Sequence, residues 1–163
     1  MAAKTDLDLG DPVAIKGTRE FDAPVALVFA AFTDPKHLVQ WWGPNGFTTT
    51  TSHFELKPGG VWRFVMHGPD GRDYQNRITF DEIETNRRIA YRHGGGEADL
   101  EPVTFAQTVT FEDIGGGRTR IVWHGIFPNA QMRDFVIKEY GADKGLQETT
   151  ARLAGYVATM ARN

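Results

Sequence analysis

Hydrophobic and polar residues alternate through the middle of the chain, and this two-residue period is typical of half-buried β-strands. Between residues 61 and 67, for example, Trp62, Phe64 and Met66 share one face. The same period and the turn sequences between the runs predict further strands at residues 12–22, 47–56, 74–83, 88–93, 103–111 and 118–127.

Spacings of three and four residues indicate helices at both ends of this strand region. Asp22 to Pro24 is a helix start, and Asp34-Pro35 ends that helix and begins a second short one, which runs toward residues 41–44. Near the end of the chain, Asn129 is expected to cap a short helix and Asp143 a long one that reaches about Ala161. The apolar stripe of the long helix is Leu146, Thr150, Leu153, Val157 and Met160.

This order of elements predicts an α+β fold with a curved antiparallel sheet of about six to seven strands. Such a sheet is too short to close on itself, so its concave face needs an apolar cover. The long C-terminal helix supplies that cover, in the arrangement known as a helix-grip fold. We expect one domain at residues 12–163, preceded by a flexible tail at residues 1–11.

Composition narrows the chemistry. The chain has 163 residues and no cysteine, which excludes disulfides and thiol nucleophiles. Its formal charge is −3, and it has no run of basic residues that would indicate nucleic-acid binding. No apolar run approaches the roughly 20 residues of a membrane span, and no secretory signal is visible, so we expect a cytoplasmic protein. No nucleotide-binding loop occurs, and the five histidines form no HExxH pattern, so we predict no cofactor and no metal.

Three stretches resemble the heat-shock protein 90 ATPase activator-homologue family of the START-like, or SRPBCC, superfamily. They are FDAPVALVFAAFTDPKHLVQWWG at residues 21–43, ELKPGGVWRFVMHGPDG at residues 55–71, and the Gly-then-Leu pattern of residues 145–160. The resemblance covers about residues 13–161. It implies the helix-grip fold and a cavity between sheet and long helix, which in the superfamily binds lipids, sterols, polyketides or hormones. Eukaryotic chaperone-activating members carry an additional N-terminal domain, so a chaperone contact is the weaker expectation here.

The inward stripes provide candidate cavity residues, because large rings on a concave sheet tend to leave a pocket against the helix. The alternative for each of them is a filled core. Asn76 and Gln107 interrupt apolar stripes, and either would hold a ligand's polar end or pair with a neighbouring strand. The full candidate set is Trp41, Trp62, Phe64, Met66, Tyr74, Asn76, Ile78, Phe105, Gln107, Trp123, Leu146, Thr150 and Leu153.

Three functions remain open. The first is binding of a small, mostly apolar molecule without covalent chemistry. The second is a cyclase- or hydrolase-type enzyme that uses polar cavity residues, with His53 or Glu55 as an acid–base group if their strand face points inward. The third is a protein-interaction module. A homodimer is compatible with a small domain of this kind, although no residue pattern decides it.

Overall fold

The computed structural model describes residues 5–95 and 105–161, which form an eight-stranded antiparallel sheet and four helices. The strand order across the sheet is β1-β2-β8-β7-β6-β5-β4-β3. The strands are β1 (Asp6–Asp8), β2 (Ala14–Phe21), β3 (Thr48–Phe54), β4 (Val61–His67), β5 (Asp73–Glu84), β6 (Arg88–Gly95), β7 (Phe105–Gly115) and β8 (Arg118–Ile126).

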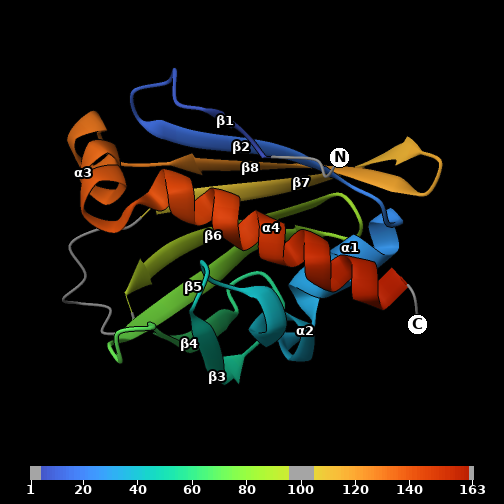
Figure 1. Ribbon diagram of the computed structural model, residues 1–163, viewed down its shortest axis with the longest axis horizontal. Coiled ribbons are helices and arrows are strands. Elements are labelled where there is room, and N and C mark those ends of the chain that lie inside the picture. Colours follow the sequence, from blue (N-terminus) through green and yellow to red (C-terminus); the bar gives the residue numbers. More distant parts are fainter. Residues whose placement is uncertain (1–4, 96–104, 162–163) are drawn as a thin grey trace.

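The helices lie on one face of this sheet (Figure 1). They are α1 (Val25–Thr33), α2 (Pro35–Trp41), α3 (Ala130–Tyr140) and α4 (Ala142–Ala161). The long helix α4 crosses the face, with α1 and α2 beside its C-terminal half and α3 at its start (Figure 1). This is the predicted α+β helix-grip architecture.

The helix boundaries follow from local chemistry. The Asp34 side chain accepts a hydrogen bond from the backbone N–H of Lys36, so it caps α2 directly after α1 has ended. Asn129 caps α3 in the same way through the N–H of Met132. Gly141 adopts a left-handed conformation that ends α3 and turns the chain into α4. Asp143 lies in the first turn of α4, one residue inside the helix that it was expected to cap.

Two predictions about the sheet require correction. Residues 6–8 belong to the segment expected to be a loose tail, but they form β1 and pair with residues 16–18 of β2. Three residues are too few to show a period, so only pairing with β2 reveals this edge strand. The sheet consequently has eight strands, one more than the upper prediction. Most of residues 94–102, between the strands predicted at 88–93 and 103–111, lie outside the described residues, and so does Val103.

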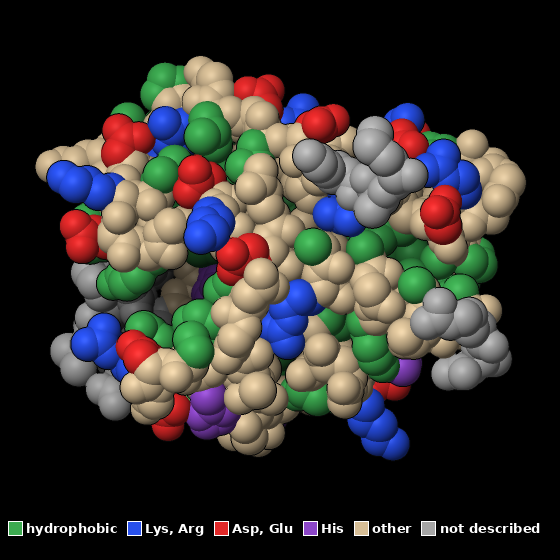
Figure 2. All heavy atoms as spheres, viewed as in Figure 1, with side chains coloured by type: hydrophobic (Ala, Val, Ile, Leu, Met, Phe, Trp, Pro, Cys, Tyr) green, Lys and Arg blue, Asp and Glu red, His purple; other side chains and the backbone are tan. Residues whose placement is uncertain are grey.

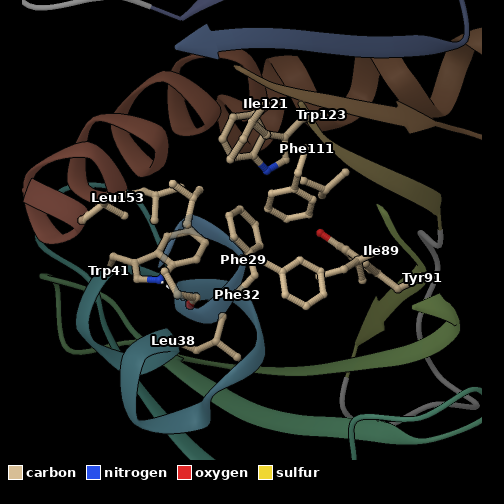
Figure 3. Close-up of a cluster of buried hydrophobic side chains, with 14 of the residues drawn as sticks. Phe29, Phe32, Leu38, Trp41, Ile89, Tyr91, Phe111, Ile121, Trp123 and Leu153 are labelled. Atoms are coloured by element: carbon tan, nitrogen blue, oxygen red, sulfur yellow. Dashed lines mark hydrogen bonds between the residues drawn. The ribbon is translucent and has the colours of Figure 1, made fainter. Parts of the chain in front are cut away.

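The core fills the half of the sheet that faces α1, α2 and the second half of α4. Phe32 packs edge-on against both Trp41 and Phe111, with ring centroids 4.9 and 5.2 Å away (Figure 3). Leu153 and Val157 close this cluster from α4 and are almost completely buried. Helices α1 and α2 do not cover the first half of α4, and the candidate site lies between that half and the sheet.

Candidate functional site

Two connected hollows lie between the first half of α4 and the sheet. The inner chamber has a volume of about 240 Å³ and the outer chamber about 540 Å³. Figure 2 shows the opening as a dark hollow beside the start of α4. The residues that line both chambers are Pro44, Met66, His93, Phe105, Val136 and Ala142.

Eight of the thirteen predicted cavity residues line these chambers. The inner chamber is bounded by Trp41, Gln107, Trp123 and Leu146, and the outer chamber by Tyr74 and Asn76, while Met66 and Phe105 reach both. They come from α2, β4, β5, β7, β8 and α4, so the fold gathers side chains that are far apart in the sequence.

The other five predicted residues belong to the packed core. Trp62 and Phe64 stack at a centroid distance of 3.9 Å, and Ile78 is buried beside them. Thr150 donates a hydrogen bond to the Leu146 carbonyl, and Leu153 is fully buried. The three sheet residues share stripes with residues that line the chambers, but helices α1 and α2 and the middle of α4 fill the space in front of them.

The corner at residues 41–44 is both a packed helix end and a cavity wall. The Trp41 indole N–H donates to the Ala31 carbonyl, which fixes the end of α2. Arg152 of α4 donates through Nη1 to the carbonyls of Gly43 and Pro44 at 2.8 and 3.0 Å. Helix α4 therefore holds this wall in place through a charge-assisted contact.

Gly125 makes room for one polar cavity residue. It lies directly opposite Gln107 in the β7–β8 pairing, and a Cβ atom there would come within 2.7 Å of Gln107 Oε1. Gly17, one strand further, allows a similarly close approach of Leu146. Both glycines thus permit larger side chains to lie flat against the sheet beneath the start of α4.

His93 is a polar site residue that the sequence prediction missed. It lies on β6 opposite Ile78 and Phe105, and its ring is 5.1 Å from that of Phe105. The signal was present, because Ile89, Tyr91 and His93 follow the inward alternation of β6. The strand was too short, and the histidine too polar, for the pattern alone to place it in a cavity.

A hydrogen bond to Asn76 fixes the His93 ring. Nε2 of His93 lies 2.9 Å from Oδ1 of Asn76, whose Nδ2 donates to the Tyr74 carbonyl at 3.0 Å. Burial lowers the pKa of His93 to about 4, because the apolar surroundings disfavour the imidazolium. The ring is therefore neutral at physiological pH.

His53 and Glu55, the alternative acid–base pair, point away from the cavity. A register shift between Thr51 and His53 interrupts the inward–outward alternation of β3. Thr49 and Thr51 therefore face the interior, whereas His53 faces solvent. His53 and Glu55 bond to each other at 2.9 Å on the surface, and that hydrogen bond lowers the pKa of Glu55. Neither contributes to chemistry in the chambers.

No helix in the described part of the chain is long and apolar enough to cross a membrane. Within residues 5–95 and 105–161, no three His, Asp or Glu side chains converge to form a group that could hold a metal ion.

The architecture, an antiparallel sheet gripping a C-terminal helix over a partly open interior, defines a START-like protein. Residues 22–158 match the family described as Activator of Hsp90 ATPase homolog 1-like protein, and the chain belongs to this family. No curated protein matches the sequence.

Solved structures agree with this assignment. A protein from Arthrobacter aurescens is 24% identical, with a TM-score of 0.86 over 98% of this chain and 93% of that one. A protein from Mycobacterium smegmatis is 25% identical, with a TM-score of 0.83 over 96% of this chain and 97% of that one. A protein from Silicibacter pomeroyi, named for the same family, is 19% identical, with a TM-score of 0.73 over 90% of this chain and 99% of that one. These similarities establish the fold.

Proposed function

We propose that the chain binds a small, mostly apolar molecule in the cavity between the sheet and the first half of α4. The observation that carries this proposal is the inner chamber, an unfilled volume of about 240 Å³ beside an otherwise packed core. The chamber is open to solvent on one side, as a site that takes up a molecule from outside has to be. Mostly apolar walls with a few placed polar groups are typical of small-molecule sites.

The enzyme alternative has one observation in its favour, the perturbed His93 in the cavity. A histidine with a pKa of about 4 is a weak proton acceptor near neutral pH, where an efficient general base has a pKa close to the working pH. Binding is therefore the better supported function.

Titration with the neutral fluorescent dye N-phenyl-1-naphthylamine tests the proposal. Energy transfer from Trp41 and Trp123, which line the inner chamber, to the dye should report binding there. Ala142→Phe places a ring where both chambers meet and should abolish binding. Ala151→Phe adds the same ring to an exposed site on the same helix and should leave binding unchanged.

Circular dichroism would establish that both variants fold. Absence of dye binding, or equal binding by the two variants, would contradict the proposal. Native mass spectrometry of the protein purified from its own cells, followed by extraction of bound molecules, would then identify the natural ligand.

A further inference from the structure

The polar groups of the inner chamber constrain the charge of its ligand. Among the described lining residues there is no Asp, Glu, Lys or Arg, and the polar side chains besides the tryptophans are Tyr91, His93, Gln107 and Thr149. An ion buried without a partner of opposite charge costs far more than a neutral group. At the outer chamber the charged lining residue is Glu139, which would repel an anion at the entrance. The chamber therefore suits an uncharged molecule.

The Asn76 amide determines which nitrogen of His93 carries the hydrogen. Nδ2 of Asn76 donates to the Tyr74 carbonyl, so Oδ1 is the atom that faces His93. The reverse orientation of the amide would bring two oxygens together. Oδ1 is an acceptor, so the ring nitrogen that faces it must carry a hydrogen. In a neutral imidazole the second ring nitrogen then has no hydrogen and can only accept a hydrogen bond. Nε2 thus carries the hydrogen, and Nδ1 holds a lone pair that can accept a hydrogen bond.

Nδ1 has no hydrogen-bond donor among the residues that the structure describes, and the His93 ring borders both chambers. His93 is partly buried and faces the chambers, so water can bond to Nδ1 while the chambers are empty. A ligand that displaces this water has to supply a donor of its own or leave the acceptor unpaired, which is unfavourable. We infer that the ligand is an uncharged molecule with a hydroxyl group that donates a hydrogen bond to Nδ1 of His93. This inference rests on the proposed binding function and adds the chemical class of the ligand.

The chamber volume sets the size of a suitable probe. A cavity of about 150 Å³ holds benzene, so a chamber of about 240 Å³ accommodates a compact two-ring molecule. The matched probes are 2-naphthol, which has the donor, naphthalene, which lacks it, and 2-naphthoate, which is an anion. A phenolic hydroxyl is un-ionised at neutral pH.

Two substitutions at position 93 separate the two ring nitrogens. In His93→Gln the side-chain amide nitrogen reaches the place of Nε2, so the bond to Asn76 is kept and the acceptor at Nδ1 is lost. In His93→Asn the shorter side chain puts its oxygen near the place of Nδ1, so an acceptor is kept and the bond to Asn76 is lost. A purely structural role for His93 would make both variants bind the probes alike.

Calorimetric titration of the wild type and both variants provides the test. We expect 2-naphthol to bind the wild type and His93→Asn about 3- to 10-fold more tightly than naphthalene does, as one net hydrogen bond predicts. His93→Gln should bind the two probes equally, and 2-naphthoate should bind none of the three proteins measurably.

The contrary outcomes are distinct. Equal binding of 2-naphthol and naphthalene by the wild type, with both blocked by Ala142→Phe, would refute the hydroxyl preference and leave the proposed function intact. A preference that survives in His93→Gln would show that Nδ1 is not the acceptor. Tight binding of 2-naphthoate would refute the preference for an uncharged ligand. Absence of binding by every probe would overturn the proposed function and the inference together.

Discussion

The neutral state of the half-buried His93 predicts how folding stability depends on pH. The pKa of this residue is about 4 in the folded chain and about 6.5 in the unfolded chain. Between these values the unfolded chain binds a proton that the folded chain does not, so the free energy of unfolding falls as the pH is lowered. Well above pH 6.5 His93 is neutral in both states, and well below pH 4 it is protonated in both, so its contribution is constant in these ranges.

The magnitude follows from the size of the shift. A difference of about 2.5 units at 1.36 kcal/mol per unit corresponds to about 3 kcal/mol in total, of which about 2 kcal/mol is lost between pH 7 and pH 4.5. The rings of Phe64 and Phe105 lie beside His93. The charged residues that line hollows together with His93 are Glu139 at the outer chamber and Arg77 and Arg92 in an adjoining groove.

Urea unfolding followed by tryptophan fluorescence, at several pH values in this window, measures the effect. The comparison is between the wild type and His93→Gln, which keeps the hydrogen bond to Asn76 but does not titrate. All other ionisable groups are common to both proteins, so the difference between the two profiles isolates His93. Parallel profiles would show that the ring is charged or freely solvated in the folded chain, and would refute the account of the site given above.

Two further predictions separate core from cavity. Leu153→Ala should lower the free energy of unfolding by about 2 to 5 kcal/mol, because the Leu153 side chain is fully buried. Leu146→Ala should lower it clearly less, because the Leu146 side chain already borders a hollow. Equal losses in urea unfolding would contradict this division into core and cavity. Gly125→Ala should displace the Gln107 amide, weakening 2-naphthol binding while changing stability by no more than about 1 kcal/mol, since a flexible side-chain end gives way. The control is Gly155→Ala, at an exposed helical position with open space around the added carbon, which should stabilise by roughly 0.5 to 1 kcal/mol and leave probe binding unchanged.

The local period of the sequence predicted the elements well, because it depends only on which side of a strand or helix meets the core. Strand β4 was predicted at residues 61–67 and has these bounds. The short helices after β2, the long C-terminal helix and the inward face of β5 also follow from the pattern. β1 did not, since three residues that pair at an edge leave no period to detect.

The division of one inward stripe into core and cavity was decided by tertiary structure. Trp62 and Met66 share a face of β4, yet Trp62 is packed among other rings and Met66 borders both chambers. The difference arises from where α1, α2 and α4 cross the sheet, which no local spacing encodes.

The state of His93 shows the same limit most clearly. Alternation along β6 is enough to direct the side chain inward, since successive residues of a strand point to opposite faces. Its neutral charge and the acceptor role of Nδ1 depend on burial and on a bond to Asn76 of the neighbouring strand. The sequence by itself thus determined which residues face the interior. Strand register and helix placement determined which of them meet, because contacts between distant segments form only when the whole chain packs.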